Sequence, residues 1–329
     1  MKTVGLTFDL KTDYQFKEDD PHDANAEFDH PSTIDVISRA IESQGFAVKK
    51  IGNVKNLLDN IDSLGVDIVF NISEGMHGRN RESQIPVILE MKNIPFVGSD
   101  GLTLGVTLDK IMAKKIFIAE GIPTPAFFEV KSSQELINMN HYKFPLMVKP
   151  RFEGSSKGLS EHSRVTNAQE LGKQVELIIE KYKQPALIEE FISGQEFTAA
   201  VIGNDEPQVL PVVQIKIDGK LQLDNQFYTF ARIASDKLEY VCPAPIDKEL
   251  EAKLKDYALR TYNAVETRDF GRVDFRVDKE GNPYVLEINP LPSLSTEDVF
   301  MLISKQIGIS YEQMIGRILN FALKRYGLN

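Results

Sequence analysis

Residues 271–295 carry four polar side chains whose types and spacing suit the binding of a metal ion and a phosphate. Arg272 and Asp274 alternate with apolar residues in one predicted strand. Glu287 and Asn289 stand two residues apart in a second strand, beyond a turn that contains glycine and proline. Side chains two residues apart share a face of a strand, so we expect a hairpin that gathers two carboxylates, an amide oxygen and a guanidinium. This set suits Mg²⁺ and the phosphate that it carries, although a charged hairpin face is often only solvated.

A loop rich in glycine and serine follows the strand that we expect to end at Lys149. Residues 151–160 contain two glycines, three serines and two basic residues, among them Ser155, Ser156 and Lys157. Glycine lets backbone N–H groups approach an anion, while serine and lysine add donors and charge, so this composition favours a triphosphate. The loop lacks the P-loop pattern, and a flexible hairpin loop is the alternative interpretation.

Two further segments are candidates for contacts with a nucleotide. Residues 189–196 place apolar side chains, including Ile192, between Glu189 and Glu196, which suits a flat purine and its polar groups. Farther back in the chain, a predicted helix begins with a capping aspartate followed by Lys110. A cation opposes the helix dipole there, so Lys110 is either solvated or neutralised by a nearby anion.

The composition indicates a globular chain without internal disulfides. It has 329 residues, of which 42% are apolar, a net charge of −10 and a single cysteine, Cys242. No apolar run reaches the roughly eighteen residues that a membrane span needs. A mostly negative surface argues against a nucleic acid or an anionic membrane as partner. A lone cysteine fits a reducing compartment, so we expect a cytoplasmic protein.

The order of the predicted elements indicates an α/β fold. The first part has predicted strands at 4–8, 46–51 and 66–71, helices at 32–43 and 54–64, and a long polar loop at 11–30. Apolar strands separated by helices predict a parallel sheet covered on both faces, whose ligands bind beyond the carboxyl ends of the strands. The later part predicts an antiparallel sheet and helices at 166–182, 248–265 and 299–326, the last broken at Gly308. No G-x-G-x-x-G follows the first strand, so a dinucleotide-binding fold has no support.

Short motifs along nearly the whole chain resemble, in their order, those of the D-alanine–D-alanine ligase family of ATP-grasp enzymes. They are FN-x-x-EG near residue 71, IPFVGS at 94–99, DK at 109, KP-x-x-EGSS-x-G at 149, EEFISGQEFT at 189, CPAP at 242, RVDF at 272 and LEINP at 286. The resemblance implies an ATP-grasp fold with an N-terminal parallel α/β domain at 1–96, a central subdomain with a glycine-rich lid at 97–187, and a C-terminal subdomain with the metal site at 188–329. It also implies a ligase of peptidoglycan synthesis that joins two small amino acids through an acyl-phosphate, with ATP, two Mg²⁺ ions (or Mn²⁺) and, in many members, a homodimer.

The resemblance further implies a role for each candidate residue. Lys110, Lys149 and Ser156 bind ATP phosphates, Ser155 acts from the lid, Glu189 and Ile192 line the adenine slot, Glu196 binds the ribose, and Asp274, Glu287 and Asn289 bind the metal ions. Arg272, helped by the backbone N–H of Ser293, stabilises the acyl-phosphate and the tetrahedral intermediate. Glu27 receives the ammonium group of the first substrate.

The departures from the family pattern all concern the amino-acid substrates. Glu74 stands where the family commonly has histidine, and Ser293 stands where it has glycine. Arg232 and Ile233 replace a Lys-Tyr pair, so the tyrosine of that pair is missing. Asp298 and Val299 replace the Ser-Leu pair that binds the carboxylate of the second substrate. An aspartate there repels a carboxylate. The sequence therefore predicts an ATP-dependent ligase like D-alanine–D-alanine ligase. The alternatives are a ligase of the same mechanism for another carboxylate and amine, and a nucleotide-binding protein without catalysis.

Overall fold

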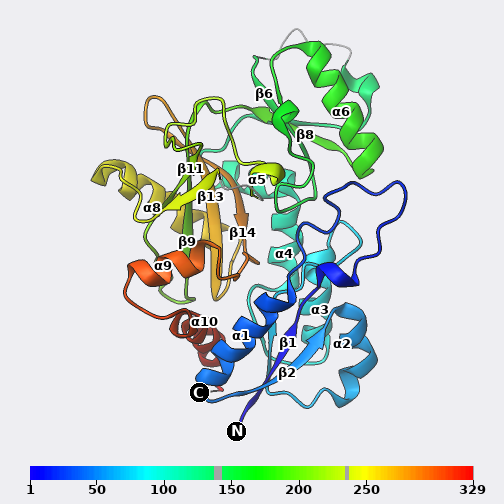
Figure 1. Cartoon of the computed structure of the whole chain (residues 1–329), viewed down its shortest axis with the longest axis vertical. Coiled ribbons are helices and arrows are strands. Elements are labelled where there is room, and N and C mark those ends of the chain that lie inside the picture. Colours follow the sequence, from blue (N-terminus) through cyan, green and yellow to red (C-terminus); the bar gives the residue numbers. More distant parts are fainter. Residues whose placement is uncertain (137–142, 234–236, 329) are drawn as a thin grey trace.

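The structure is a computed structural model that describes residues 1–136, 143–233 and 237–328. It contains three sheets, which follow one another along the chain and surround a common centre (Figure 1). Both termini lie at the same end of the molecule. Within the described ranges, no helix is long and apolar enough to cross a bilayer.

The first sheet is parallel and has the strand order β2-β1-β3-β4. Its elements are β1 (Thr3–Thr7), α1 (Pro31–Ser43), β2 (Ala47–Gly52), α2 (Val54–Asn60), β3 (Ile68–Asn71), α3 (Gln84–Met91) and β4 (Phe96–Val97). Val4 and Leu6 of β1 pack with α1 on one face, whereas Val69 of β3 packs with α2 and α3 on the other. The prediction of a parallel sheet covered on both faces is confirmed.

Two helices, α4 (Gly101–Leu108) and α5 (Lys110–Ala119), lead away from the first sheet. Asp109 separates them and caps α5, as its position in the sequence predicts. The sequence analysis missed α4, because glycine and threonine, which disfavour helices, make up half of GLTLGVTL. The helix forms because Asp100 caps it and because it buries Leu104.

The second sheet is antiparallel and has the order β5-β8-β6-β7. Its strands are β5 (Phe127–Val130), β6 (Leu146–Pro150), β7 (Arg164–Val165) and β8 (Ala186–Glu190), and α6 (Ala168–Tyr182) covers it. Leu171, Val175 and Ile178 give α6 the spaced apolar face that packs against these strands. The lid loop at 151–160 begins where β6 ends.

The third sheet is antiparallel and has the order β12-β11-β9-β13-β14, with β10 paired to β9. It contains β9 (Gly194–Ile202), β10 (Gln208–Val209), β11 (Val213–Ile217), β12 (Leu238–Val241), β13 (Phe270–Asp278) and β14 (Pro283–Asn289), with α7 (Phe230–Ile233) between β11 and β12 and α8 (Lys248–Ala264) before β13. Val273 and Phe275 of β13 pack with α8 and α5. The polar residues that alternate with them therefore face the other way, toward the centre of the molecule.

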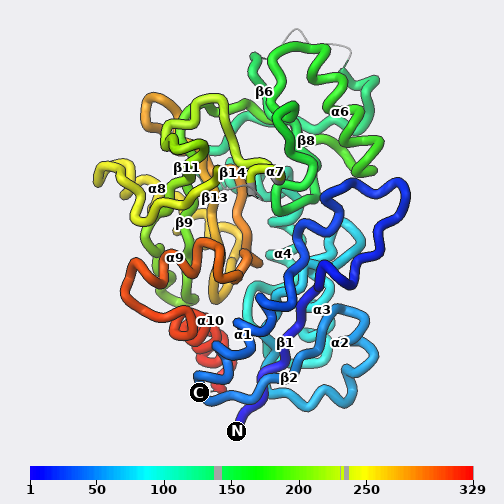
Figure 2. The backbone as a smooth tube through the Cα atoms, in the orientation of Figure 1, coloured from blue at the N-terminus to red at the C-terminus, as the bar shows by residue number. Residues whose placement is uncertain are grey.

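The last two helices, α9 (Val299–Gln306) and α10 (Tyr311–Arg325), are separated near Gly308, as predicted. Figure 2 shows the red α10 beside the blue α1, and buried residues of both helices belong to one hydrophobic core. Arg325 of α10 lies 2.7 Å from Asp269 Oδ2 and donates to the carbonyl of Phe96 in β4. The end of the chain thus braces the first sheet against the third.

We propose the domain division 1–96, 97–187 and 188–329 on the basis of the three sheets, with one adjustment. Strand β8 pairs with β5 and β6 of the second sheet, so the second limit falls after Glu190.

Candidate functional site

A cavity of about 700 Å³ lies between the three sheets. Its walls are formed by the β13–β14 hairpin, the lid loop, the polar loop at 11–30 and the segment that follows β3. Every site residue predicted from the sequence lines this cavity: Glu27, Lys110, Lys149, Ser155, Ser156, Glu189, Ile192, Glu196, Arg272, Asp274, Glu287, Asn289 and Ser293. Residues that are far apart in the chain are therefore brought to one place.

The register of the hairpin brings the metal-binding candidates together. Arg272 pairs with Asn289, and Asp274 pairs with Glu287 across the two strands. Asp274 accepts hydrogen bonds from the hydroxyl of Thr198 (2.6 Å), from Asn289 Nδ2 (3.0 Å) and from Arg272 (3.0 Å to each carboxylate oxygen). The structure thus has the juxtaposition that strand alternation predicts, while the binding of a metal there stays a prediction.

Lys110 is the cation nearest to the second carboxylate of the hairpin. Its Nζ lies 2.5 Å from Glu287 Oε2. Burial raises the pKa of Glu287, but the charges of Lys110 and Lys149 outweigh it and lower the pKa to about 2. Of the two interpretations of Lys110, neutralisation by an anion is the one that the structure shows.

The oxygen atoms of the hairpin fit a hard divalent cation such as Mg²⁺. Asp274 and Glu287 are carboxylates, and Asn289 points its amide nitrogen at Asp274, which leaves its amide oxygen available. Mg²⁺ and Mn²⁺ prefer such ligands. Arg272 and Lys110 already lie against the same carboxylates, so this end of the cavity attracts positive charge.

Lys149 belongs to a buried cluster of charges at the end of β6. The carboxylate of Glu189 contacts Lys149 Nζ and lies 3.0 Å from Lys114 Nζ. Burial raises the pKa of Glu189, but the two lysines outweigh it and lower the pKa. Glu189 therefore fixes both lysines, and its expected place in the adenine slot stays a prediction. Sequence analysis missed Lys114, although it follows Lys110 by four residues and so shares its helix face.

Ile192 and Glu196 lie beside an arginine that sequence analysis did not single out. Arg276 donates to the backbone oxygen of Ile192 (2.9 Å) and to Glu196 Oε2 (3.0 Å). Its guanidinium also lies 5.0 Å from the ring centre of Phe191, which packs edge-on against Phe227 at 5.8 Å. These apolar and polar surfaces together suit a purine and a ribose. Arg276 could have been found from its spacing, because it continues the polar face of β13.

The tip of the lid adopts a conformation that needs support from its surroundings. Ser155 and Ser156 both have positive φ, 45° and 56°. This left-handed region is unfavourable for residues other than glycine and costs about 1–3 kcal/mol where it is enforced. Neighbouring contacts must therefore hold this turn.

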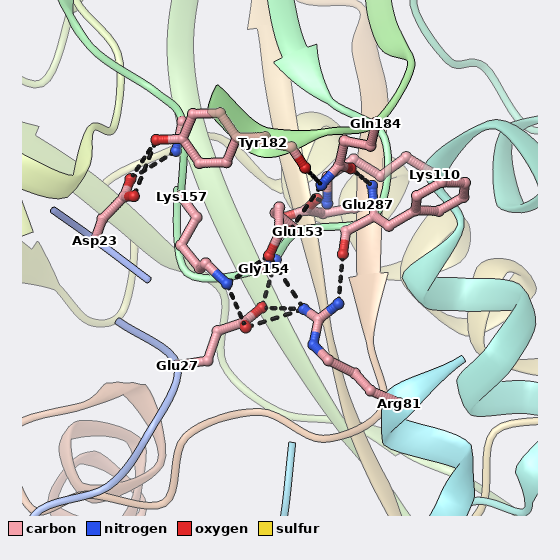
Figure 3. Close-up of polar contacts among 12 residues, drawn as sticks. Asp23, Glu27, Arg81, Lys110, Glu153, Gly154, Lys157, Tyr182, Gln184 and Glu287 are labelled. Atoms are coloured by element: carbon pink, nitrogen blue, oxygen red, sulfur yellow. Dashed lines mark hydrogen bonds and ion pairs between the residues drawn. The ribbon is translucent and has the colours of Figure 1, made fainter. Parts of the chain in front are cut away.

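Glu27 supplies much of that support (Figure 3). Its carboxylate accepts hydrogen bonds from Gly154 N (2.6 Å) and Lys157 Nζ (3.1 Å) of the lid, and from Arg81 Nη2 at 2.7 and 2.9 Å. Burial raises the pKa of Glu27, but Arg81 and Lys157 outweigh it and lower the pKa to about 2. Both oxygens are engaged, so these contacts favour a clamp on the lid over the expected role toward a substrate ammonium group. That expected role stays a prediction.

A second acid from the same loop holds the other end of the lid. Asp23 accepts hydrogen bonds from Gly158 N at 2.8 Å and from the hydroxyl of Tyr182 at 2.9 Å. Arg81, the partner of Glu27, also contacts the lid directly, because it donates a hydrogen bond to the carbonyl of Phe152 (2.7 Å). Sequence analysis missed Asp23, because the polar loop has no periodicity that distinguishes one acid from another.

Two of the positions that depart from the family pattern, Ser293 and Asp298, lie at the hairpin end of the cavity, whereas Glu74 lies close to Glu27. Asp298 caps α9 and has Oδ1 3.9 Å from Arg272 Nη1. Ser293 also lines the cavity. Two tyrosines that the sequence analysis overlooked, Tyr228 and Tyr240, also line this wall, with their hydroxyl oxygens 2.6 Å apart. Tyr228 and Tyr240 are therefore two candidates to replace the tyrosine of the family's Lys-Tyr pair, which this sequence lacks.

The segment that carries the departure at Arg232 and Ile233 is described only in part. Arg232 donates to the carbonyl of Phe227 (2.7 Å) and lies 2.8 Å from Glu161 Oε1. Ile233 ends α7, and residues 234–236 lie outside the described residues. Arg232 therefore connects α7 with the end of the lid, through Glu161.

Comparison with known proteins identifies the family of this chain. The family described as "D-ala D-ala ligase C-terminus" matches residues 116–320. An uncharacterized protein, y4sG, of Sinorhizobium fredii is 38% identical, over 79% of this chain and 75% of its own length. The D-alanine–D-alanine ligase of Carboxydothermus hydrogenoformans is 36% identical over 89% and 93%, and that of Pelotomaculum thermopropionicum is 30% identical over 86% and 92%.

Solved structures show the same fold. The D-alanine–D-alanine ligase of Bacillus anthracis, solved with ATP, superposes with a TM-score of 0.76 at 22% identity over 98% of both chains. The VanG D-Ala:D-Ser ligase of Enterococcus faecalis superposes with a TM-score of 0.73 at 24% identity over 98% of this chain and 99% of its own. The chain has the ATP-grasp fold, and it belongs to the D-alanine–D-alanine ligase family.

Proposed function

We propose that the chain is an ATP-dependent ligase that joins the carboxylate of one small amino acid to the amine of a second through an acyl-phosphate. The observation that carries the proposal is the register of β13 and β14, which places Arg272, Asp274 and Glu287 in one cavity with Lys149 and the lid. Relatives named D-alanine–D-alanine ligase support the same reaction.

In the first step, an oxygen of the donor carboxylate attacks the γ-phosphorus of ATP. The bond between that phosphorus and the bridging oxygen breaks, so ADP leaves and an acyl-phosphate forms. Lys110, Lys149 and Arg272 supply positive charge where negative charge develops. Their carboxylate partners already hold them in place, so they need little reorganisation during the reaction.

In the second step, the acceptor amine attacks the acyl carbon, phosphate leaves and the new amide nitrogen loses its proton. Arg272 and the backbone N–H of Ser293 are the proposed donors to the oxyanion of the tetrahedral intermediate. The lid, with Ser155 and Ser156 at its tip, covers the cavity and keeps out water that would hydrolyse the acyl-phosphate.

The hairpin also gives the proposed metal site its ligands. Asp274, Glu287 and Asn289 would hold one or two Mg²⁺ ions, which when bound neutralise phosphate charge and align the phosphates. Other residues would hold the nucleotide: Lys110, Lys149 and Ser156 at the phosphates, and Glu189, Ile192 and Glu196 at the nucleoside. Arg276 joins this last group through its contacts with Ile192 and Glu196.

The second candidate, a ligase with substrates other than two molecules of D-alanine, rests on one observation. Asp298 lies in the cavity and 3.9 Å from Arg272, where its charge disfavours an acceptor carboxylate. The second candidate is therefore a ligase of the same mechanism for a neutral or cationic acceptor. A cytoplasmic location and a homodimer stay predictions of the sequence.

Release of ADP by the purified chain with Mg-ATP and pairs of D- and L-amino acids tests the proposal, with mass detection of each product. We expect ADP in a one-to-one ratio with a ligated product. Strict dependence on D-alanine alone selects the first candidate, and a different productive pair selects the second. ATP binding without ADP release for any pair contradicts both and supports a nucleotide-binding protein without catalysis.

A further inference from the structure

Arg276 of β13 makes more contacts than its place beside the nucleoside requires. Its side chain lines the cavity and is nevertheless only 4% exposed. A buried arginine keeps its charge and therefore needs acceptors for its N–H groups. The guanidinium of Arg276 has four of them, one carboxylate and three backbone carbonyls, and they belong to two separate parts of the chain.

The first two contacts hold residues that we assign to the nucleoside. Arg276 donates from Nε to the carbonyl of Ile192 (2.9 Å) and from Nη1 to Glu196 Oε2 (3.0 Å). Burial raises the pKa of Glu196, and the charge and the hydrogen bond of Arg276 oppose that rise. Arg276 therefore favours the ionised form of Glu196, which accepts hydrogen bonds from hydroxyl groups more strongly than the neutral form.

The other two contacts hold residues 222–228, which precede α7 and which we call the wall segment. Arg276 donates from Nη1 to the carbonyl of Gln226 (2.9 Å) and from Nη2 to the carbonyl of Asp224 (3.0 Å). The backbone N–H of Asp224 also donates to the carbonyl of Gly194 at the start of β9 (3.0 Å). The wall segment is thus attached both to β9 and to the side chain of Arg276.

The two residues that follow Gln226 belong to different parts of the cavity. Phe227 packs edge-on against Phe191, beside the residues assigned to the nucleoside. Tyr228 lines the same wall as Asp298. Burial is the main cause that raises the pKa of Tyr228 to about 12, and the charge of Asp298 adds to it. A shift of the wall segment would therefore affect both the nucleoside slot and the wall that we assign to the acceptor.

We propose that Arg276 is a positioning residue for both the nucleotide and the acceptor, because it orients the carboxylate of Glu196 toward the ribose and fixes the wall segment that carries Tyr228. One guanidinium can do both, since its N–H groups form a planar fork with fixed directions. Loss of Arg276 should therefore weaken the recognition of the ribose and the use of the acceptor together. This inference rests on the proposed function, which supplies the nucleotide and the acceptor.

Packing against an aromatic ring is the alternative reason for a buried arginine at this position. The guanidinium of Arg276 lies 5.0 Å from the ring centre of Phe191. Arg164 of β7 lies 5.1 Å from the centre of the same ring, but it does not line the cavity. Arg164 is therefore the matched control for an effect of packing alone.

Equilibrium binding of two nucleotides with Mg²⁺ tests the first half of the inference without requiring turnover. The probes are ADP and 2′,3′-dideoxy-ADP, which lacks both ribose hydroxyl groups. In the unmodified protein we expect ADP to bind about 10-fold more tightly than the dideoxy form. Glu196→Gln and Arg276→Met should each bring this ratio close to one. The double variant should not lower it further, because Arg276 acts through Glu196. Arg164→Met should keep the preference.

Hydrogen–deuterium exchange of the wall segment tests the second half. The backbone N–H groups of Asp224 and Gln226 are hydrogen-bonded, so their exchange reports whether the segment stays in place. Arg276→Met should exchange about 10-fold faster in residues 222–228. Glu196→Gln should leave that exchange unchanged, because the contacts of Arg276 with the two carbonyls remain. With the productive pair of amino acids from the ADP-release panel, the KM of the acceptor should also rise about 10-fold in Arg276→Met.

Arg276→Lys keeps the test decisive if Arg276→Met does not fold. Lysine retains a positive charge beside Glu196, so the variant should keep part of the ribose preference. A single ammonium group cannot reach the carboxylate and all three carbonyls, so the exchange of residues 222–228 should still be faster than in the unmodified protein.

The possible results separate the inference from the proposed function. Equal binding of the two nucleotides by the unmodified protein, or a full preference in Arg276→Met, overturns the inference. Unchanged exchange of the wall segment in both Arg276 variants, or an unchanged KM of the acceptor, also overturns it. Equal effects of Arg164→Met would overturn it in favour of packing. If the binding and exchange results are as expected but no ADP is released with any acceptor, the proposed function fails while the positioning of Glu196 and the wall segment by Arg276 stands.

Discussion

The two ends of the cavity contain the same kinds of side chain, but they affect a buried glutamate in opposite ways. At the hairpin, Glu287 has a lysine 2.5 Å away, and its pKa is lowered to about 2. At the other end, Glu82 of the turn Arg81–Ser83 has Glu74 as its neighbour, and its pKa is raised to about 7. Burial favours the neutral form at both ends, so the neighbouring charge makes the difference.

This difference indicates what each end still needs. The lysines at the hairpin keep Glu287 ionised, so its carboxylate can bind a metal ion. At the other end, burial and neighbouring acids raise the pKa of Glu74 and Glu82, so this end favours the neutral form of its carboxyl groups. Variants that remove one carboxylate at a time test this difference.

Glu287→Gln should have the largest effect. The change removes a charge from the proposed metal site and preserves the shape of the side chain, so kcat should fall at least about 100-fold. Substrate-dependent ADP release measures this loss, and circular dichroism should show an unchanged fold. Glu280→Gln, in the exposed turn of the same hairpin, is the matched control and should keep full activity. Normal turnover by Glu287→Gln would refute the metal assignment.

Glu27→Gln should have the second largest effect, because it loosens the lid from Arg81. Removing one partner of a buried ion pair costs about 3–5 kcal/mol, and an open lid admits water to the acyl-phosphate. We expect a productive kcat/KM about 10- to 100-fold lower and more ADP than ligated product. Chemical denaturation and the ratio of ADP to product measure the two effects.

A different result for this variant would restore the original assignment of Glu27. If the residue binds the donor ammonium group, the KM of the donor should rise while ADP and product stay equal. Glu18→Gln, an exposed change in the same loop, controls for the loss of an acid from that loop.

The hairpin end could be predicted from the sequence because it depends on local rules. Strand alternation orients Asp274, and a turn of fixed length sets its pairing with Glu287. The unfavourable place of Lys110 at a helix start left two interpretations, solvation or a nearby anion, and the structure contains the anion. Each of these signals lies within a few residues of the side chain that it concerns.

The acid-rich end could not be predicted in the same way, because three irregular segments meet there. The partner of Glu27 is Arg81, from a turn 54 residues later, and the lid contact comes from Gly154, 127 residues later. No periodicity orients such residues, so the choice between substrate and lid as partner of Glu27 depends on tertiary structure. Helix α4 was missed for a related reason, since burial outweighs the low helix propensity of its residues.

Glu82→Gln should change stability in a pH-dependent way. Glu82 holds its proton up to about pH 7 in the folded protein, but only to its ordinary value of 4.5 in the unfolded chain. Folding therefore takes up a proton between these values, and the unmodified protein loses stability as the pH rises from 4.5 through 7. The variant lacks this loss, so its advantage should be about 1–3 kcal/mol at pH 8 and small at pH 5.

Urea denaturation at both pH values measures the effect of Glu82→Gln. Asp29, whose pKa is also raised to about 7 by burial, is present in both proteins and cancels from the comparison. A variant that gains equally at pH 5 and pH 8 would show that Glu82 is ionised throughout and that the two ends of the cavity do not differ.

Asp298→Ser should have the smallest effect, at the wall beside the hairpin. Aspartate and serine both cap helices well, so α9 should keep its start and the unfolding temperature should change little. Arg272, 3.9 Å away, already offsets part of the negative charge of Asp298, so use of D-alanine as acceptor should improve only about two- to tenfold. The measurement is kcat/KM for D-alanine with a fixed donor, compared with Asp256→Ser, an exposed change in α8. Unchanged or poorer use of D-alanine would mean that the shape of this wall, including its two tyrosines, selects the acceptor instead of charge.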